Sequence, residues 1–240
     1  MAIVDSFFDS PALQAKTAFR AILPDDVDLR TCPVLYLLHG MYGTYLSWCE
    51  NTEIESLSKE YGIAVIMPDA KNSFYTDAVR GERYYTYIAK ELPELVSRMF
   101  CLGGERHIAG LSMGGYGAFK LAFLNPGMFK TAASFSGCVD LANLIAGPLE
   151  EHQIKMYLDI FGTRDIAGTE HDMSSHINTS IPLYQRCGTE DFLYSNNKRF
   201  RSAALAAGAK LQYSEGPGEH TWPFWADAIS DYIPWALKQF

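Results

Sequence analysis

The chain has 240 residues, of which 48% are hydrophobic and 20% charged, and its formal net charge is −8. This length can bury a large core around a central sheet. The acidic balance and the lack of a Lys/Arg-rich run argue against nucleic acid as a partner. No apolar run approaches the ~20 residues that span a bilayer, and residues 1–5 lack the features of a signal peptide. We therefore expect a cytoplasmic protein with no membrane partner.

The cysteines are odd in number and widely scattered, and none forms a Cys-x-x-Cys pair. This pattern favours reduced thiols over disulfides and makes a metal site the least favoured interpretation. The five residues are Cys32, Cys49, Cys101, Cys138 and Cys187.

The predicted elements alternate between strands and helices along the chain. Short apolar runs predict buried strands, and longer runs with helical spacing predict helices. Pro93 falls inside one of these helices and is expected to bend or restart it. The expected strands are 3–8, 17–23, 34–38, 63–67, 108–111, 131–136, 181–188 and 210–214, and the expected helices are 52–60, 84–99, 118–124, 194–207 and 222–239.

This alternation predicts an α/β fold with a mostly parallel central sheet and helices on both faces. We expect one domain over residues 1–240. Residues 139–180 are the least regular part, with a helix around 149–160, and are interpreted as a small insertion over the edge of the sheet.

A serine between two glycines, in the pattern Gly110-x-Ser112-x-Gly114, lies where strand 108–111 gives way to helix 118–124. Strand, sharp turn and helix are the context that makes this pattern a nucleophile elbow. The glycines leave room for the two backbones to approach, and the helix points its amides and positive dipole end at the space over Ser112. A serine-hydrolase site is therefore predicted, against the alternative of a glycine-rich packing corner.

A serine nucleophile needs a base, and the α/β-hydrolase order along the chain is Ser, then Asp or Glu, then His. Of the four histidines after Ser112, His220 lies in a Gly/Pro loop between the last strand and the last helix, which can place its imidazole over the sheet edge. We predict that His220 is the base. His152, His171 and His176 lie in the insertion and are interpreted as surface histidines.

The acid is expected just after the strand 181–188, where Glu190 and Asp191 are neighbours. Asp191 is chosen because the apolar pair that follows it would draw it inward, whereas Glu190 is interpreted as solvated or as a helix-start residue. Asp140, after the strand 131–136, is a further candidate with a stronger interpretation as a turn or cap residue.

Backbone amides are required to hold an oxyanion. Met113, directly after the serine, should supply one. Met41 should supply the other from the loop after strand 34–38, with Tyr42 as the alternative. His39 is interpreted as a structural residue of that loop.

Several aromatic residues flank the predicted site and are candidates to line a substrate pocket, with ordinary core packing as the alternative for each. Asp77 and Arg80 are expected either to reach the site or to pair with each other. The aromatic candidates are Tyr42, Trp48, Tyr75 and Trp222, with Tyr45 and Phe224 nearby.

Five segments match the motifs of one family: Leu37-Leu38-His39-Gly40-Met41-Tyr42-Gly43, Ser73-Phe74-Tyr75-Thr76-Asp77, Gly110-Leu111-Ser112-Met113-Gly114-Gly115-Tyr116-Gly117, Gly188-Thr189-Glu190-Asp191 and Glu219-His220-Thr221-Trp222. Together, over nearly the whole chain, they resemble the esterase D-like family, and within it the bacterial tributyrin-type esterases. The resemblance implies an α/β-hydrolase fold, carboxylesterase activity on short acyl chains, and no cofactor. It implies that Ser112, Asp191 and His220 form the catalytic triad and that the backbone amides of Met41 and Met113 hold the oxyanion.

The expected function is therefore hydrolysis of a small-molecule ester, with acetyl or feruloyl esters of plant carbohydrate as candidate substrates. S-formylglutathione hydrolases are wider relatives, but they usually carry Gly-His-Ser where this chain has Gly-Leu-Ser. This difference makes hydrolysis of a glutathione thioester a less favoured interpretation. Two further interpretations are acyl transfer to a sugar acceptor and a non-catalytic binding protein on a hydrolase fold. Members of the family are often dimers or tetramers, so a homo-oligomer is also expected.

Overall fold

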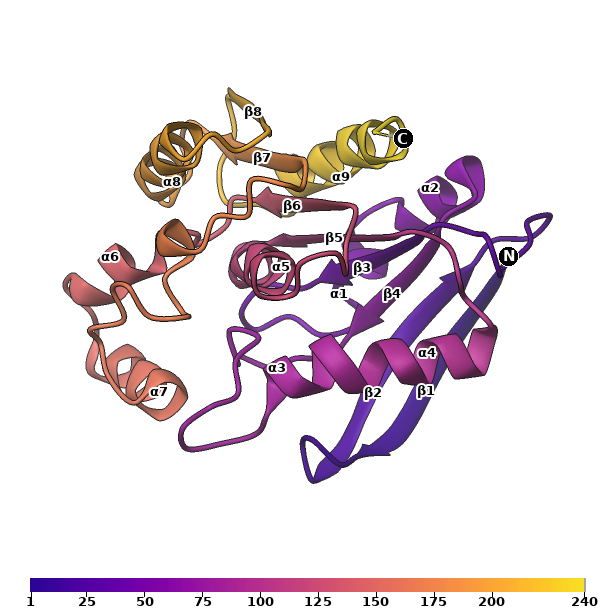
Figure 1. Cartoon of the computed structure of the whole chain (residues 1–240), viewed down its shortest axis with the longest axis horizontal. Coiled ribbons are helices and arrows are strands. Elements are labelled where there is room, and N and C mark those ends of the chain that lie inside the picture. The colour runs from indigo at the N-terminus through magenta and orange to yellow at the C-terminus, as the bar shows by residue number, and fades with distance from the viewer. Residues whose placement is uncertain (240) are drawn as a thin grey trace.

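One sheet organises residues 1–239, the part of the chain that this computed structural model describes (Figure 1). Its eight strands lie in the order β1-β2-β4-β3-β5-β6-β7-β8. The pairs β1/β2 and β2/β4 are antiparallel, and every other neighbouring pair is parallel. The strands are β1 (Ala2–Ser10), β2 (Ala15–Leu23), β3 (Val34–Leu38), β4 (Ala64–Pro68), β5 (Arg106–Leu111), β6 (Thr131–Phe135), β7 (Leu183–Gly188) and β8 (Leu211–Gly216).

The central strands are apolar along their whole length because helices cover both faces of the sheet. Every residue of β3, β4 and β6 is buried. The edge strand β1 alternates instead between exposed and buried positions. The predicted α/β fold with a mostly parallel sheet is thereby confirmed, and its topology is that of the α/β-hydrolase fold.

Helices pack on the two faces of the sheet and form two apolar cores. On one face, α9 contributes Trp225, Ile229 and Ile233 to a core shared with α1 and α2. On the other face, α5 packs against the sheet, and Phe119 stacks on Phe200 of α8. The helices are α1 (Ser47–Asn51), α2 (Ile54–Tyr61), α3 (Tyr84–Thr86), α4 (Leu92–Phe100), α5 (Met113–Leu124), α6 (Leu141–Ala146), α7 (Glu151–Phe161), α8 (Tyr194–Ala206) and α9 (Trp222–Leu237).

The predicted helix over 84–99 is present as one continuous helical run that contains a π-helical turn. A π-helical turn, Tyr87–Glu91, separates α3 from α4, and Pro93 lies in the first turn of α4. Because proline has no N–H and its ring crowds the carbonyl four residues earlier, a regular α-helical hydrogen bond cannot form at this position. Pro93 therefore neither ends the helical run nor begins a separate helix. The short helices α1 and α6 were not predicted.

Residues 139–180 contain α6, α7 and a 3-10 turn at Met173–Ser175. Figure 1 shows α6 and α7 beyond the ends of β5 and β6, on the side of the sheet where the nucleophile elbow lies. A capping box formed by Glu150 and Gln153 starts α7. This segment therefore covers the edge at which the candidate site is built.

A lysine is buried in the middle of α5. Lys120 is only 2% exposed, and its Nζ lies 2.5 Å from Thr76 Oγ1 and 3.1 Å from His171 Nδ1. Burial lowers the pKa of Lys120 to about 7, although the negative charges of Glu170 and Asp77 oppose the shift. Removing a cation from water costs free energy, and the lowered pKa expresses that cost.

Replacing Lys120 with methionine is expected to flatten the dependence of stability on pH. Because the folded pKa of about 7 lies below the ordinary value of 10.5, the unfolded chain holds more protons between those two pH values. The free energy of unfolding should therefore rise with pH in this window by about 1.4 kcal/mol per unit on account of this group. Urea unfolding of the wild type and of Lys120→Met at pH 7.5 and pH 9 measures the difference. Equal slopes in the two proteins would contradict a lowered pKa.

Candidate active site

Ser112 lies between β5 and α5 on a strained backbone. Its φ of 53° and ψ of −118° place it in a conformation that L residues rarely adopt, and the strain is typical of functional turns. A Cβ on Gly110 would approach the Gly114 carbonyl oxygen to 2.3 Å, and a Cβ on Gly114 would approach the Leu38 carbonyl oxygen to 2.4 Å. Neither contact is sterically possible. The two glycines of the motif therefore permit the close approach of strand and helix that raises the serine above the sheet.

The structure brings together the three side chains that the sequence predicts as neighbours. His220 Nε2 lies 3.0 Å from Ser112 Oγ, and His220 Nδ1 lies 2.8 Å from Asp191 Oδ2. Asp191 follows β7, and His220 lies between β8 and α9. Because β5, β7 and β8 run parallel, their ends lie at the same edge of the sheet, where residues distant in sequence can meet.

The carboxylate of Asp191 is buried but well satisfied. Its Oδ1 accepts a hydrogen bond from the Leu193 amide at 2.8 Å, and its Oδ2 faces the imidazole of His220. Burial alone would raise the pKa of Asp191, but the hydrogen bonds from His220 and from the Leu193 amide outweigh it and lower that pKa. An ionised Asp191 accepts a hydrogen bond from Nδ1–H of His220. This fixes the proton on Nδ1 and leaves Nε2 free to accept the hydroxyl proton of Ser112.

Glu190, the alternative acid, does not contact His220 but holds the loop that carries it. Its Oε2 accepts a hydrogen bond from the Gly218 amide at 2.5 Å, and its own amide donates to the Gly218 carbonyl at 3.1 Å. A Cβ on Gly188 would lie 2.0 Å from the same carbonyl oxygen. Two loops thus pack backbone to backbone, and this contact fixes the position of His220.

Aromatic rings flank the imidazole of His220. The Phe192 ring lies 4.5 Å from it, centroid to centroid, and the Trp225 ring 4.9 Å in an edge-on arrangement. Phe192 is 75% exposed, which is unusual for so large an apolar side chain. The imidazole of His220 therefore packs against aromatic rings as well as contacting Asp191.

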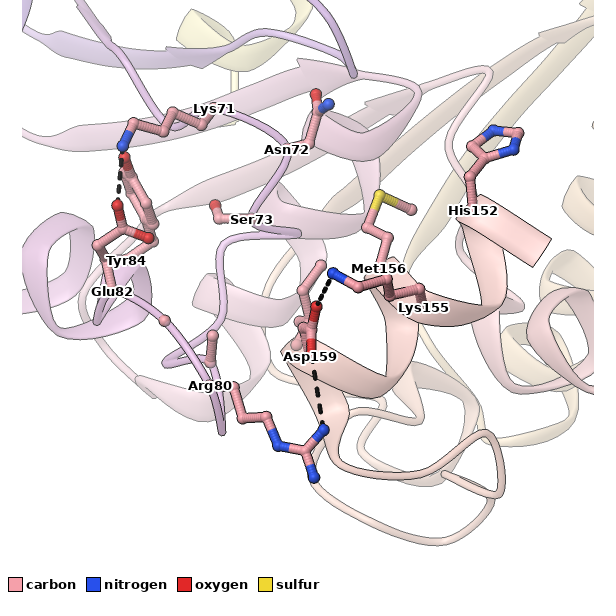
Figure 2. A pocket seen from close by; sticks show the side chains of 13 residues that line it. Lys71, Asn72, Ser73, Arg80, Glu82, Tyr84, His152, Lys155, Met156 and Asp159 are labelled. Atoms are coloured by element: carbon pink, nitrogen blue, oxygen red, sulfur yellow. Dashed lines mark hydrogen bonds and ion pairs between the residues drawn. The ribbon is translucent and has the colours of Figure 1, made fainter. Parts of the chain in front are cut away.

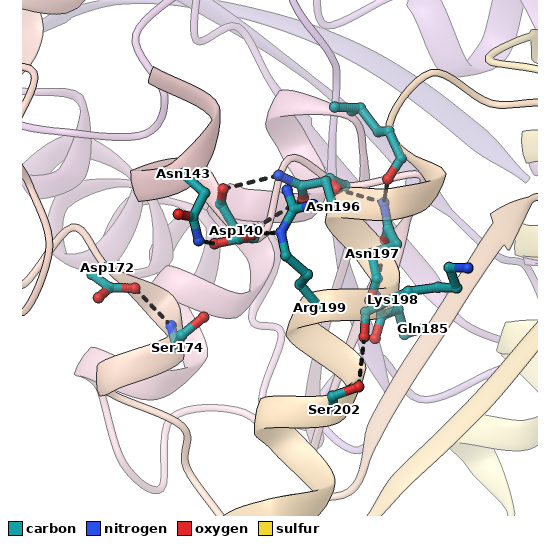
Figure 3. A network of polar contacts seen from close by, with 12 residues as sticks. Asp140, Asn143, Asp172, Ser174, Gln185, Asn196, Asn197, Lys198, Arg199 and Ser202 are labelled. Carbon is teal, nitrogen blue, oxygen red and sulfur yellow. Dashed lines mark hydrogen bonds and ion pairs between the residues drawn. The ribbon is translucent and has the colours of Figure 1, made fainter. Parts of the chain in front are cut away.

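Asp140, the other candidate acid, lies in a separate network (Figure 3). Its carboxylate accepts hydrogen bonds from Arg199 Nε at 2.5 Å and from Asn143 Nδ2 at 2.7 Å. Its backbone exchanges two hydrogen bonds with the Asn196 side chain. Asp140 therefore occupies the N-cap position of α6, where its carboxylate ties α6 to α8 and makes no hydrogen bond to the backbone of the helix.

The three histidines of the insertion, His152, His171 and His176, do not line the cavity that opens over Ser112. His152 lies on the exposed side of α7, and His176 Nε2 contacts the Thr169 carbonyl at 2.9 Å. His171 corrects the interpretation as a surface residue, because only 17% of its side chain is exposed. Burial, together with the smaller effect of the nearby Lys120, lowers the pKa of His171 to about 4, so its ring is neutral at physiological pH.

The loop after β3 closely approaches Ser112. A Cβ on Gly40 would lie 2.6 Å from Leu111 Cδ1 and 3.3 Å from Ser112 Cβ, so glycine is required for this approach. The Tyr42 amide is engaged by Asn72 Oδ1 at 2.7 Å. Of the two amides that the sequence analysis leaves open, Met41 is thus the candidate. Met113 begins α5, where the first N–H groups have no intrahelical acceptor.

His39 holds this loop from inside the protein. Its Nε2 accepts a hydrogen bond from the Ala70 amide at 2.9 Å, so the proton resides on Nδ1, which donates to the Gly40 carbonyl at 2.7 Å. Burial lowers the pKa of His39 and keeps the ring neutral. The prediction of a structural role for His39 is confirmed.

A cavity of about 500 Å³ opens over Ser112. Its wall is largely apolar, and within residues 1–239 the lining contains no Asp, Glu, Lys or Arg. The insertion supplies three of the apolar side chains, and no motif in the sequence indicates that they lie at the site. The residues that form the apolar wall are Met41, Tyr42, Phe74, Leu111, Cys138, Leu144, Leu149, Tyr157, Phe192, Leu193, Trp222 and Trp225.

Two of the four predicted pocket residues are in the wall, and two are not. Tyr42 and Trp222 line the cavity. Trp48 is buried and donates from Nε1 to the Leu38 carbonyl at 3.1 Å, and Tyr75 is buried and donates from its hydroxyl to the His39 carbonyl at 2.8 Å. Neither side chain lines the cavity, so the alternative of core packing applies to Trp48 and Tyr75. Both instead support the backbone of the loop that carries Met41.

A second cavity, of about 380 Å³, lies between the loop 71–84 and α7 (Figure 2). Figure 2 shows Arg80 directed at Asp159, with the charged atoms 3.7 Å apart. Asp77 instead contacts Thr86, with its Oδ2 2.5 Å from the threonine hydroxyl. Asp77 and Arg80 thus neither pair with each other nor line the cavity over Ser112.

Within residues 1–239 no group of three or more His, Cys, Asp or Glu side chains is arranged to hold a metal ion, and no helix is long and apolar enough to cross a bilayer. The five cysteines are free thiols.

Known proteins resemble this chain over nearly its full length. An acetyl esterase of Caldicellulosiruptor saccharolyticus is 31% identical, with 99% of each chain covered. An S-formylglutathione hydrolase of Bos taurus is 32% identical over 94% of this chain and 89% of that one. Fluorophosphonate-binding serine hydrolase F of Staphylococcus aureus, solved with substrate bound, has a TM-score of 0.90 and 29% identity, with 99% of each chain covered.

The family described as Putative esterase matches residues 10–236, almost the entire chain. The match includes the loop after β3, the elbow at Ser112 and the segments that carry Asp191 and His220. The chain therefore belongs to this esterase family and is a carboxylic ester hydrolase with the α/β-hydrolase fold.

Proposed function

We propose that the protein is a serine carboxylesterase that hydrolyses short-chain esters of uncharged alcohols through an acyl-enzyme intermediate. The observation that carries the proposal is the hydrogen-bonded series Ser112–His220–Asp191 at the floor of an apolar cavity. This arrangement supplies a nucleophile, a base and an orienting carboxylate in the geometry that acyl transfer requires.

In the first half of the reaction, Ser112 Oγ attacks the ester carbonyl carbon while His220 Nε2 takes its proton. The negative charge that develops on the carbonyl oxygen is held by the amides of Met41 and Met113. The ionised Asp191 stabilises the imidazolium of His220. As the tetrahedral intermediate collapses, His220 gives its proton to the leaving alkoxide, and the acyl group remains on Ser112.

In the second half, water enters the position that the alcohol has left. His220 takes a proton from this water, which attacks the acyl carbon, and the oxyanion is again held by the same two amides. Collapse releases the carboxylic acid, and His220 returns the proton to Ser112 Oγ. No cofactor takes part in these steps.

The cavity favours uncharged substrates. Without a charged side chain in its wall, it offers no partner for a carboxylate or an ammonium group, and burying an unpaired charge is costly. A volume of about 500 Å³ exceeds what an acetyl group needs. We therefore propose acetyl and butyryl esters as substrates, with feruloyl esters as a larger candidate whose ring would contact the aromatic wall.

S-formylglutathione hydrolysis is the second candidate, and the relative from Bos taurus is the observation in its favour. Against it, glutathione carries two carboxylates and an ammonium group that this cavity does not pair. Transfer of the acyl group to a sugar, in place of water, uses the same first half-reaction and is a third candidate. An alcohol acceptor that yields ester product at the expense of free acid would reveal it.

A panel of substrates tests the proposal. We expect kcat/KM for p-nitrophenyl acetate and butyrate to exceed that for S-formylglutathione by roughly a hundredfold or more, because each uncompensated buried charge costs several kcal/mol. Methyl ferulate and acetylated xylan test the two carbohydrate candidates. A higher kcat/KM for S-formylglutathione than for every oxygen ester would contradict the proposed substrate class.

A further inference from the structure

Helix α5, which follows Ser112, contains a lysine, Lys120, that the proposed mechanism does not use. Two turns beyond Ser112, Lys120 is buried against the rings of Tyr85 and Tyr116, which lie 5.8 Å and 5.6 Å from its Nζ. An apolar side chain of similar length would fill the same volume without the cost of removing an amine from water. What Lys120 adds is therefore a set of hydrogen bonds, and these connect two segments of the active site.

The first bond reaches the wall of the cavity over Ser112. Lys120 Nζ donates to Thr76 Oγ1 at 2.5 Å, and the Thr76 hydroxyl in turn donates to the Phe74 carbonyl at 2.9 Å. Phe74 lines the cavity, and its ring packs edge-on against Tyr157 of α7 at 5.4 Å. The amine thus supports, through one hydroxyl, the backbone that presents Phe74 to the substrate.

The backbone at this point is strained and needs such support. Phe74 and Tyr75 have φ values of 50° and 51°, in the left-handed region that costs an ordinary L residue free energy. The Tyr75 ring packs on Gly117 of α5, where a Cβ would lie 2.3 Å from the ring. Its hydroxyl donates to the His39 carbonyl, two residues before Met41. The segment that Lys120 holds therefore also supports the loop with the candidate oxyanion amide.

The second bond reaches the insertion. Lys120 Nζ lies 3.1 Å from Nδ1 of His171, whose ring is neutral, so the two nitrogens share one hydrogen bond. Tyr116, also on α5, donates from its hydroxyl to the His171 carbonyl at 3.0 Å. The nucleophile helix is thereby tied both to the Phe74–Tyr75 segment and to the segment that follows α7.

We propose that Lys120 is a positioning residue for ester hydrolysis, which sets the wall at Phe74 and the loop at Met41 through its hydrogen bond to Thr76. The inference rests on the proposed function at Ser112 and adds a residue to it. Lys120 touches neither substrate nor the reacting atoms. Its effect is exerted through Thr76, so variants of the two residues should have the same kinetic signature.

The test compares Thr76→Val with Thr76→Ser, alongside Lys120→Met and the double variant Lys120→Met/Thr76→Val. Valine has the shape of threonine without the hydroxyl, and serine keeps the hydroxyl. Each protein is assayed with p-nitrophenyl acetate and butyrate, and thermal unfolding is followed in parallel. Wild type and Ser112→Ala assayed with the same esters establish whether hydrolysis occurs at Ser112.

We expect Thr76→Val and Lys120→Met each to lower kcat/KM for the butyrate ester by roughly tenfold, since small displacements of positioning groups have effects of this size. The acetate ester should lose less, because an acetyl group is too short to depend fully on Phe74. Thr76→Ser should retain the wild-type ratio of butyrate to acetate, and the double variant should lose little more than either single one.

A lower unfolding temperature with both kcat/KM values unchanged would overturn the proposal and leave Lys120 a purely structural residue. If Lys120→Met does not fold, the Thr76→Val and Thr76→Ser pair still decides, because equal butyrate-to-acetate ratios in the two would also overturn it. An inactive wild type, or a fully active Ser112→Ala, would instead contradict the proposed function itself.

Discussion

Replacing Ser112 with alanine is expected to lower kcat/KM for p-nitrophenyl acetate by about 10⁴-fold or more, with only the oxyanion amides and the cavity left to act on the ester. The substitution removes Oγ, which lies 3.0 Å from His220 Nε2, and leaves the backbone amide of Met113 in place. Binding should therefore persist while acyl transfer stops. Steady-state kinetics measures the loss of turnover, and a fluorophosphonate, which bonds covalently to the serine oxygen, should no longer label the variant.

The control is the same substitution at a serine of the adjacent strand. Ser134 in β6 is buried, and its hydroxyl forms no hydrogen bond with any residue that the structure describes. Ser134→Ala should therefore keep the wild-type rate and the label. If Ser112→Ala retained wild-type turnover, or if Ser134→Ala lost as much activity, the assignment of the nucleophile would be wrong.

The sequence could predict the meeting of Ser112, Asp191 and His220 because each residue lies in a segment whose backbone path is dictated locally. The glycines around Ser112 permit a sharp turn between strand and helix, and a Gly/Pro loop brings His220 to the sheet edge. Chain order excluded His39, and the apolar Phe192-Leu193 pair favoured Asp191 over Glu190. These arguments depend on short stretches of sequence and on the parallel sheet, which the alternation of elements also predicts.

The cavity could not be predicted in the same way, because aromatic residues near a site in sequence can face either the substrate or the core. Trp48 and Tyr75 lie close to the motifs but turn inward, where each finds a backbone carbonyl for its polar atom. Leu144, Leu149 and Tyr157 come from the irregular insertion and reach the cavity only through its tertiary packing. No periodicity or motif in the sequence specifies that packing.

The supporting contacts are equally hidden from the sequence. Glu190 looks like a solvated carboxylate until the Gly218 amide is found 2.5 Å from it, 28 residues further along the chain. Lys120 is the only charged residue of α5, and the sequence does not indicate that this helix is buried almost all round. In both cases the partner lies on a segment whose approach is set by the whole fold.

Replacing Asp191 with asparagine should lower kcat by about 10⁴-fold while the fold is retained, as expected when an orienting carboxylate is exchanged for an amide. Asparagine fills the same buried volume, and its oxygen can still accept the Leu193 amide. Its NH₂ group then faces His220 Nδ1 and donates to it, which moves the imidazole proton to Nε2. A protonated Nε2 cannot take the proton of Ser112. Kinetics with p-nitrophenyl acetate, combined with circular dichroism of the folded variant, check this result.

Glu190→Gln is the matched control, because it makes the same carboxylate-to-amide change at the neighbouring position. The Glu190 side chain is exposed and bonds the Gly218 amide, which a glutamine oxygen can also accept. The substitution affects only the hydrogen bond that positions the His220 loop. We therefore expect kcat to fall by less than about tenfold, which is typical of one exposed hydrogen bond. If Glu190→Gln were the more damaging variant, Glu190 would have to replace Asp191 as the partner of His220. The 2.8 Å contact between Asp191 Oδ2 and His220 Nδ1 predicts the opposite order.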